Sequence, residues 1–220
     1  MNRQHSEAFL DAAHTALLMI DIQNDFCHKD GVAGREGKNL AMMEGMLSHA
    51  SRLLQAARTA GVLVVHVQHT VLPVGGSDAP AWRYFLSPLS PDGKIVVQGT
   101  WGHGFMDAVK PLPGENILTK HRSSAFFNTQ LDTLLRARQV RTIAICGVLA
   151  EGCVESTLRD SFHRDYYPVL VPDATASYSK DIHSAYVMVA SARHDAMSTD
   201  DLMAAWVQQP VPRVADLRVA

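Results

Sequence analysis

The stretch RTIAICGVLAEGCVESTLRDSFHRDY, residues 141–166, decides the fold. Within it, residues 142–148 form an apolar, β-branched run of the kind found in strands that are buried on both faces. Acidic and basic residues four positions apart then predict a helix: Glu155 with Arg159, and Asp160 with Arg164. Apolar residues recur at the spacing of a buried helical stripe: Val154, Leu158 and Phe162. The stretch therefore predicts a strand, a short loop and a helix, with Cys153 at the start of the helix.

A cysteine in this position is either a catalyst or a small buried residue. The unpaired N–H groups and the positive dipole end of the helix favour the thiolate of Cys153, because the pKa of a free thiol is only about 8.5. Free cysteine is also among the residue types most often buried. Taken alone, the segment leaves both interpretations open.

The composition narrows the class of protein. The chain has 220 residues, with 20 Lys and Arg against 22 Asp and Glu and a net charge of -2. Such a balance provides no long-range field to attract nucleic acid or an anionic membrane, and it suits a small-molecule substrate. The three cysteines show no metal-ligand spacing, and residues 1–21 show no export or membrane segment, so we expect a reduced, cytoplasmic protein.

Short apolar runs alternate with longer amphipathic stretches along almost the whole chain. The runs that predict strands are residues 16–21, 62–68, 116–120, 142–148 and 168–174. Two amphipathic stretches predict crossover helices, residues 42–60 and 128–138. This alternation predicts an α/β fold in a single domain, with a parallel sheet that is covered by helices on both faces.

Residues 73–113 depart from this rhythm. Proline and glycine are frequent there, and aromatic residues occur without a period: Trp82, Tyr84, Phe85, Trp101 and Phe105. A long segment with little regular pattern is usually functional, so we expect it to cross the sheet edge and to help wall a pocket. The alternative is a solvated insertion with a few aromatic residues packed beneath it.

Three ionisable residues fall at the carboxyl ends of predicted strands. Asp21 closes the first apolar run, Lys120 closes the third, and Cys153 follows the fourth after a short loop. Ligands of an open parallel sheet bind beyond these ends, so an acid, a base and a thiol are expected to share one crevice. Taken singly, Asp21 is also compatible with a helix cap and Lys120 with a solvated strand end.

Three segments carry a resemblance to a known family: LLMIDIQNDF, TKHRSSAFFNTQLDTLL and CGVLAEGCVESTLRDSF. In the same order, and over about residues 15–175, the chain resembles the isochorismatase-like cysteine hydrolases. The resemblance implies a three-layer α/β/α domain with a six-stranded parallel sheet in a Rossmann-like strand order. It also implies an Asp–Lys–Cys triad at Asp21, Lys120 and Cys153, and association into homo-oligomers such as dimers or tetramers.

The hypothesis that follows is acyl transfer through a thioester. The thiolate of Cys153 attacks a carbonyl, Asp21 serves as the general base, and Lys120 holds positive charge between them. By resemblance, the backbone amides of Leu149 and Cys153 form the oxyanion hole, with a cis peptide expected between Val148 and Leu149. The loop departs from the family pattern at Leu149 and Glu151. We expect Leu149 to narrow the pocket, and Glu151 either to contact the substrate or to be a solvated carboxylate.

The substrate is expected to be a small ureido or carbamoyl compound of the biuret, triuret or ureidoacrylate type. The run QGTWGHGFMDAVKP resembles that of the corresponding amidohydrolases. Nicotinamidase-like members are expected to bind a metal through an Asp-x-His pattern, which His66 and His69 lack, so neither a metal nor another cofactor is predicted. Candidate substrate contacts are Gln23, Phe26, Trp101 and Glu151, although Phe26 is also credible as core and Gln23 as a tie within its own loop.

Two other classes of function stay open, an isochorismatase-type ether hydrolase and a non-catalytic small-molecule-binding member of the fold. A papain-like Cys–His protease is disfavoured, because His163 lies ten residues beyond Cys153 on the same predicted helix. The single domain is expected to have a core over about residues 15–205. Residues 206–220 mix Trp206 with prolines and suggest either an arm that crosses a neighbouring subunit or a frayed tail.

Overall fold

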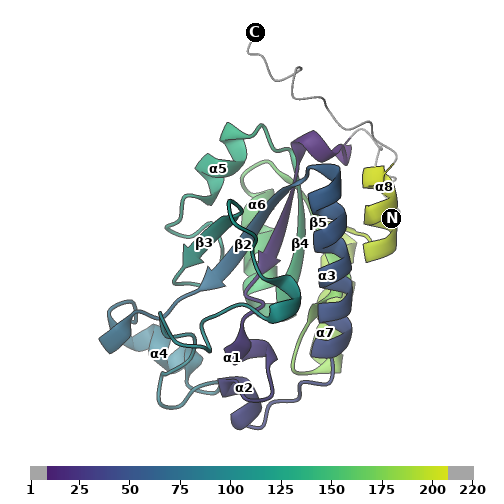
Figure 1. The fold of residues 1–220 in the computed structure, drawn as a ribbon. Coiled ribbons are helices and arrows are strands. Elements are labelled where there is room, and N and C mark those ends of the chain that lie inside the picture. Colours follow the sequence, from purple (N-terminus) through teal and green to yellow (C-terminus); the bar gives the residue numbers. More distant parts are fainter. Residues whose placement is uncertain (1–8, 208–220) are drawn as a thin grey trace.

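A computed structural model describes residues 9–207 and shows a three-layer α/β/α domain (Figure 1). All six strands are parallel, in the order β3-β2-β1-β4-β5-β6. Their bounds are β1 Thr15–Ile20, β2 Leu63–His69, β3 Asn116–Lys120, β4 Thr142–Val148, β5 Tyr167–Ala176 and β6 Asp195–Ala196. The five predicted apolar runs are all strands, and the predicted fold class and strand order are confirmed.

The strand order places a topological switch at the middle of the sheet. The chain runs outward from β1 to β3, and then returns to the other side of β1 with β4. Every residue of β1 and of β4 is buried, as expected for central strands that helices cover on both faces. The crevice beyond the carboxyl ends of β1 and β4 is therefore where the topology expects a ligand.

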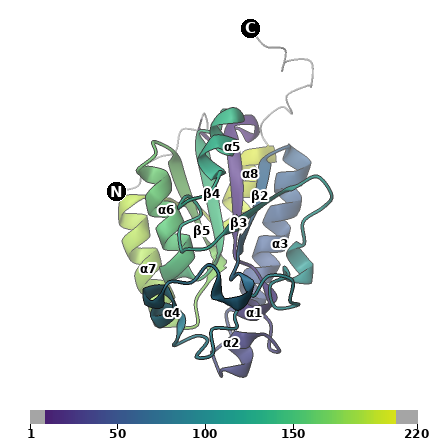
Figure 2. The ribbon, with the colours of Figure 1, turned by 90° about the vertical axis from the view of Figure 1, so that its left-hand side faces the viewer.

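Helices cover both faces of the sheet (Figure 2). One face carries α3 (Met43–Ala60) and α8 (Thr199–Val207), and the other carries α5 (Leu131–Ala137), α6 (Glu155–Phe162) and α7 (Lys180–Arg193). The helix predicted over residues 42–60 ends as expected at Gly61, which adopts a left-handed conformation with φ of 75°. The helix predicted over residues 128–138 is shorter, because Asn128 itself has a positive φ.

The helix that follows β4 begins with a π-helical turn, Ala150–Val154, which leads directly into α6. Cys153 lies in this first turn. Of the predicted apolar stripe, Val154 and Leu158 are buried, but Phe162 is 49% exposed and meets the ring of His194 edge-on at 5.3 Å. The stripe prediction was wrong at Phe162, because the helix ends at that residue, beyond the edge of the core.

The remaining short helices gather mainly around the carboxyl ends of the strands. There, α1 (Asn24–Cys27), α2 (Val32–Arg35) and α4 (Pro80–Leu86) lie at one end of the sheet (Figures 1 and 2). Three 3-10 turns complete the described secondary structure: Ala12–His14, Pro73–Gly75 and Asp107–Val109. Isolated bridges from Val71 to Val97 and from Gln23 to Phe105 tie residues 73–113 to this end of the sheet.

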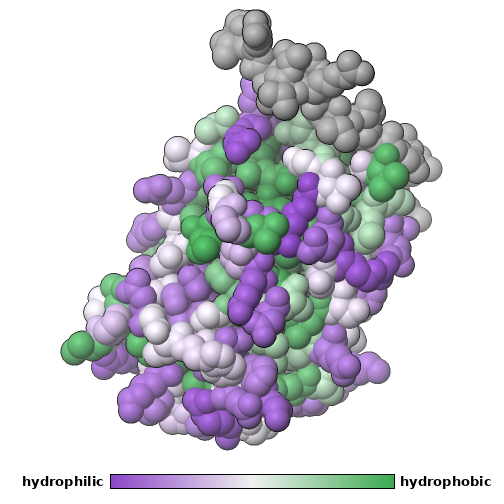
Figure 3. Space-filling model, in the orientation of Figure 1, coloured by the Kyte–Doolittle hydropathy of each residue, from purple (hydrophilic) through white to green (hydrophobic). Residues whose placement is uncertain are grey.

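The structure bears on two predictions, the absence of a membrane segment and the C-terminal arm. No helix within residues 9–207 is long and apolar enough to cross a membrane, and hydrophilic and apolar residues are interspersed over the face shown in Figure 3. At the predicted start of the C-terminal arm, Trp206 is buried, whereas Val207 is exposed; both belong to α8, which packs on α3. The rest of the predicted arm, residues 208–220, lies outside the described residues.

Candidate active site

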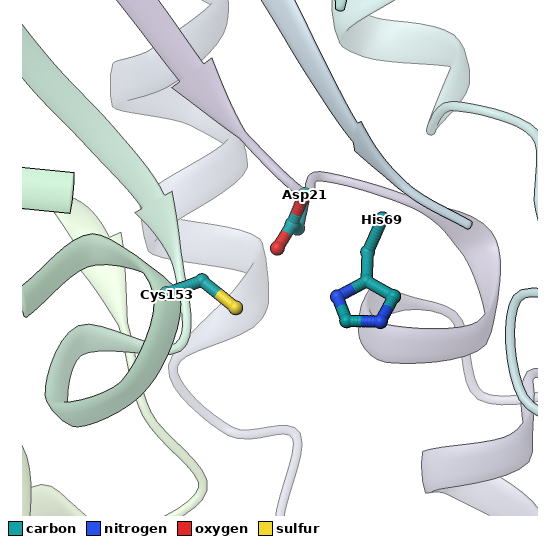
Figure 4. A group of neighbouring side chains, drawn as sticks. All are labelled: Asp21, His69 and Cys153. Carbon is teal, nitrogen blue, oxygen red and sulfur yellow. The ribbon is translucent and has the colours of Figure 1, made fainter. Parts of the chain in front are cut away.

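Asp21, Lys120 and Cys153 meet at the carboxyl edge of the sheet. The ammonium nitrogen of Lys120 lies 2.7 Å from Oδ2 of Asp21 and 3.2 Å from Sγ of Cys153. Because β2 lies between β3 and β1, the long side chain of Lys120 must pass across β2 to reach Asp21. Figure 4 shows Asp21, Cys153 and His69 converging from three different segments. The three predicted triad residues are therefore neighbours in space, although they are far apart in sequence.

The backbone at the end of β1 turns sharply to present Asp21. Its φ is 51°, in the left-handed region that aspartate tolerates better than most residues. The Asp21 amide donates to the carbonyl of Val67 at 3.0 Å, and the Asp21 carbonyl accepts from the amide of Gln23 at 2.8 Å. These two bonds hold the turn against β2 and fix the direction of the carboxylate.

A glycine allows β4 to approach this turn closely. Gly147 has a φ of 119°, and a Cβ added to it would lie 2.1 Å from the carbonyl oxygen of Ile20. Any side chain at this position would push the end of β1 away from β4 and displace the neighbouring Asp21. Gly147 therefore helps to set the distance between the acid and the thiol.

The ion pair of Asp21 and Lys120 is almost completely buried, with 1% and 0% of the side chains exposed. Burial raises the pKa of Asp21, and the positive charge of Lys120 opposes this rise. Among the described residues, neither carboxylate oxygen finds a well-aligned hydrogen-bond donor, so the ammonium at 2.7 Å is a charge contact off the usual hydrogen-bond direction. Burial alone would lower the pKa of Lys120, but Asp21 and Cys153 outweigh it and raise that pKa, so Lys120 stays charged.

The thiol of Cys153 is neutral at rest. Burial raises its pKa to about 12; Lys120 opposes the rise, and the carboxylate of Asp21 adds to it. In the resting site, burial and the carboxylate of Asp21 therefore oppose the thiolate that the helix start was expected to favour, and together they outweigh the charge of Lys120. A base must remove the thiol proton, and Asp21 is the adjacent carboxylate with a raised pKa.

The loop between β4 and Cys153 has the backbone that the family resemblance implied. The peptide bond between Val148 and Leu149 is cis. The carbonyl of Leu149 accepts from the amides of Gly152 at 3.0 Å and Val154 at 3.2 Å, which closes the turn around Cys153. The Leu149 side chain lines the cavity beside the thiol.

The triad opens into a small cavity of about 190 Å³. This volume is below the roughly 300–1,000 Å³ of typical pockets for drug-sized ligands, so it suits a small molecule. The lining residues are Asp21, Phe26, His69, Trp82, Phe85, Leu86, Pro88, Leu89, Ser123, Val148, Leu149, Gly152 and Cys153. Five of them fall within residues 73–113, so the prediction that this segment walls a pocket is confirmed.

Of the four predicted substrate contacts, the structure brings only Phe26 to the cavity. The amide nitrogen of Gln23 donates to the carbonyls of His69 at 3.0 Å and His103 at 2.8 Å, and its oxygen accepts from the amide of His69 at 2.9 Å. All of these bonds are internal to the protein. Gln23 therefore ties its own loop to the end of β2, which was the alternative considered for it.

Trp101 and Glu151 also lie away from the cavity lining. Trp101 is 55% exposed, and its ring meets that of His28 edge-on at 5.0 Å. Glu151 accepts a hydrogen bond from Ser177 at 3.0 Å through its carboxylate, and it is exposed. Both residues make contacts outside the cavity, so neither is placed to contact a substrate beside Cys153.

His69 is the site residue that sequence reasoning missed. It is the last residue of β2, is buried, lines the cavity and lies 3.3 Å from the Lys120 ammonium through Nδ1. Its ring stacks on Trp82 with centroids 5.8 Å apart and planes 9° apart. The available signal was its position at a strand end next to β1, but in the sequence His69 was considered only as a possible metal ligand.

Asp21, His69 and Cys153 also form the kind of cluster that can hold a metal ion, with ligand atoms within 4.8 Å of one another. The ammonium of Lys120 contacts all three side chains, at 2.7, 3.3 and 3.2 Å. A cation bound there would meet a buried positive charge at close range. The donor set therefore fits the ammonium of Lys120 better than a metal ion.

Relatives of this chain are named as amidohydrolases. The chain is 37% identical over 176 residues to ureidoacrylate amidohydrolase RutB of Methylorubrum extorquens, which covers 75% of this chain and 71% of that protein. It is 32% identical over 182 residues to the protein of the same name from Agrobacterium fabrum, which covers 78% and 80%. These names agree with the predicted enzyme class, a hydrolase of linear amides.

Solved structures share the fold. A cysteine hydrolase from Pseudomonas syringae pv. phaseolicola matches with a TM-score of 0.80 at 26% identity, over 89% of this chain and 93% of that one. N-carbamoylsarcosine amidase from Thermoplasma acidophilum matches with a TM-score of 0.68 at 26% identity, over 84% and 96%. The isochorismatase domain family matches residues 15–201, which is most of the chain. The chain thus belongs to the isochorismatase family.

Proposed function

We propose that the protein is a cysteine amidohydrolase that cleaves a C–N bond of a small ureido or carbamoyl compound. One observation carries the proposal: a single buried ammonium, that of Lys120, contacts both the Asp21 carboxylate and the Cys153 thiol beside a small cavity. The names of relatives, ureidoacrylate amidohydrolase and N-carbamoylsarcosine amidase, support a substrate with a carbamoyl group.

The first half of the reaction forms a thioester. Asp21 takes the proton of the Cys153 thiol as sulfur attacks the carbonyl carbon, which breaks the C=O π bond and forms an S–C bond. As the tetrahedral intermediate collapses, the C–N bond breaks, and Asp21 passes the proton to the leaving nitrogen, which departs as ammonia. Lys120 stays protonated throughout and compensates the charge that moves between Asp21 and Cys153.

The second half of the reaction releases the product. Asp21 takes a proton from a water molecule, whose oxygen attacks the thioester carbon, and the S–C bond then breaks. The thiolate leaves and regains the proton from Asp21, which restores the resting site. The remaining carbamate loses carbon dioxide in solution, so one urea group yields ammonia, carbon dioxide and an amine or amide.

Backbone amides are proposed to stabilise the oxyanion of both tetrahedral intermediates. The turn of residues 149–153 curls around Cys153, and its first peptide is the cis bond before Leu149. We assign the oxyanion to the N–H groups of Leu149 and Cys153, as the family resemblance implies. Loss of one such donor typically costs about 2.7–4 kcal/mol in the reaction barrier.

The test is ammonia release from ureidoacrylate, biuret, triuret and N-carbamoyl amino acids. Wild type is compared with Cys153→Ser and with Cys146→Ser, which changes a buried thiol of β4 that does not line the cavity. We expect turnover in wild type and Cys146→Ser, none in Cys153→Ser, and no effect of a chelator. Hydroxylamine added during turnover should intercept the thioester as an N-hydroxyurea product.

Other outcomes would point elsewhere. Full activity of Cys153→Ala on a vinyl ether such as isochorismate would favour the ether hydrolase. Absence of turnover with every substrate, together with binding of a ureide, would favour a non-catalytic member of the fold. Loss of activity on chelation would overturn the assignment of the central positive charge to Lys120.

A further inference from the structure

Two ring nitrogens at the cavity have no hydrogen-bond partner in the part of the chain that the structure describes. Nε2 of His69 and Nε1 of Trp82 are both buried and have no hydrogen-bond partner among residues 9–207. Both side chains line the cavity, and their rings are stacked nearly parallel. A buried polar group without a partner is rare in a folded protein and calls for an explanation, which a bound molecule would supply.

The protonation of His69 follows from its neighbour. An ammonium is only a donor, so Nδ1 of His69 must accept from Lys120 at 3.3 Å, and the proton of the neutral ring is on Nε2. Burial, and next the charge of Lys120, hold the pKa of His69 well below its usual range, so the ring is neutral. His69 therefore presents one N–H donor, on the opposite side of the ring from Lys120.

That direction decides which atom of a substrate His69 can contact. The carbonyl under attack must lie at Cys153, on the Lys120 side of the site. Since Nε2 points away from Lys120, it is suited to a second acceptor, one that belongs to the substituent of the substrate. In the view of Figure 4, Asp21 lies between Cys153 and the ring of His69.

Apart from His69, Ser123, Gly152 and the residues of the triad, the wall is apolar, and no lining residue carries a positive charge. Eight lining side chains are aliphatic or aromatic: Phe26, Trp82, Phe85, Leu86, Pro88, Leu89, Val148 and Leu149. The one charged residue of the lining is the acid Asp21. Outside the lining, Arg122 lies over the ring of Trp82 at 5.0 Å and donates through Nη1 to the carbonyls of Ser77 and His121. A carboxylate in this cavity would be buried beside Asp21 without a cation in the cavity lining.

We propose that this site selects an uncharged ureide with an apolar or aromatic substituent, and that His69 and Trp82 donate to a second, neutral carbonyl oxygen of that substituent. This inference rests on the proposed function, since it places the reacting carbamoyl group at Cys153. It departs from the substrate named for the curated relatives, because ureidoacrylate carries a carboxylate at the corresponding end.

The first experiment varies only the charge of the substrate. We compare 3-ureidoacrylate with its neutral amide, 3-ureidoacrylamide, by ammonia release from the wild-type protein. We expect kcat/KM to be at least tenfold higher for the amide. Binding of both compounds to Cys153→Ser by calorimetry should show the same order. The wild-type protein could instead use ureidoacrylate as well as or better than the amide, and Arg122→Gln could lose that preference. This result would overturn the proposal of an uncharged substrate and leave the proposed function standing.

The second experiment isolates the hydrogen bond from His69. Benzoylurea and benzylurea both present a urea and a phenyl ring, but only benzoylurea has the second carbonyl. His69→Phe keeps a ring against Trp82 and removes the donor, so we expect it to lower kcat/KM about tenfold more for benzoylurea than for benzylurea. His69→Gln, whose amide nitrogen reaches the position of Nε2, should recover part of this loss.

A control separates this role from general damage to the wall. Trp82→Phe should lower kcat/KM in the same pattern as His69→Phe. Tyr84→Phe, on the same helix but 83% exposed, should leave kcat/KM unchanged for both ureas. Equal losses on both ureas in His69→Phe would reveal a structural role and overturn the assignment of the donor. Turnover of biuret or of an N-carbamoyl amino acid, without turnover of these four compounds, would overturn this inference and leave the proposed function standing. Absence of turnover with every ureide in wild type would defeat both.

Discussion

Removal of the buried cation is the most informative perturbation of the triad. In Lys120→Met, an apolar side chain of similar length replaces an ammonium that lies 2.7 Å from Asp21 Oδ2. At an effective dielectric constant of about 20, two unit charges at this distance attract by about 6 kcal/mol. Part of that attraction offsets the desolvation of the two groups, so the net contribution of the pair is smaller.

The cost of breaking the pair is set by the charge that remains. Without Lys120, Asp21 is left in a buried position where neither of its oxygens accepts a well-aligned hydrogen bond. Loss of one partner of a buried pair typically costs about 3–5 kcal/mol. For a chain of this length, that loss corresponds to a decrease in Tm of roughly 6–20 °C.

The matched control is the double variant Asp21→Asn/Lys120→Met. It removes both charges and keeps the shape of the site, so we expect it to recover most of the stability that Lys120→Met loses. Activity on ureides should be absent in Lys120→Met, in Asp21→Asn and in the double variant. A stable but inactive double variant would show that the loss of activity does not come from the loss of stability.

The loss of stability in Lys120→Met should also depend on pH. Burial already raises the pKa of Asp21, and removal of Lys120 raises it further. Between the pKa of the unfolded carboxyl, about 3.9, and the raised value in the folded variant, folding binds a proton. The free energy of unfolding of Lys120→Met is therefore closest to that of wild type near pH 4, and the difference between the two grows as pH rises toward 7.

The assay is urea unfolding followed by circular dichroism at pH 4.5 and pH 7 for all four proteins. A loss below about 1 kcal/mol in Lys120→Met at pH 7 would refute the argument, because the typical cost of a broken buried pair is several times larger. So would a double variant that is no more stable than the single one. Either result would mean that water or another group compensates Asp21.

Three further predictions concern the thiol, the β1–β4 contact and the loop clamp. Because the pKa of Cys153 is about 12, the rate of its alkylation by iodoacetamide in the resting protein should rise about tenfold per pH unit from pH 7 to 9. Mass spectrometry of the labelled peptide measures this rate, and a rate that reaches a plateau below pH 8 would contradict the prediction. Gly147→Ala should abolish ureide hydrolysis and lower Tm, since its Cβ would meet the Ile20 carbonyl, whereas Gly45→Ala, which meets nothing within 4 Å in α3, should be neutral or slightly stabilising; an active Gly147→Ala protein would sink the close-approach argument. Gln23→Leu should lose about 2–4 kcal/mol in urea unfolding because its three buried hydrogen bonds vanish, and a loss no greater than that of the exposed control Gln55→Leu would count against the clamp.

The parts of the fold that follow from periodicity could be predicted from the sequence. The five long strands and α3 are marked by apolar runs and by Gly61, and the strand-end rule brought Asp21, Lys120 and Cys153 together. The two-residue strand β6 has too little sequence to show a pattern. Gln23 and Trp101 were predicted as substrate contacts from their chemistry, an amide that can hydrogen-bond and a flat ring, but the direction of a side chain depends on the loop around it.

Charge states were harder to predict than positions. The helix start at Cys153 is visible in the sequence, and its dipole favours the thiolate. The opposing effects, burial and the carboxylate of Asp21, depend on a residue 132 positions away and exist only in the folded chain. The same holds for His69, whose role depends on Lys120 from β3 and on Trp82 from α4.

The stack of His69, Trp82 and Arg122 has a consequence for how this site can change over evolution. The reacting groups sit at the ends of strands that the buried sheet holds in place, whereas five of the thirteen lining residues come from residues 82–89, an excursion that rests on the sheet edge. The ring contacts across this boundary are faces of flat groups, at 5.8 Å and 5.0 Å, and they tolerate sliding better than directed hydrogen bonds do. Mutations in that excursion can therefore reshape the cavity while the geometry of Asp21, Lys120 and Cys153 is preserved, so new substrates can be acquired without the catalyst being rebuilt.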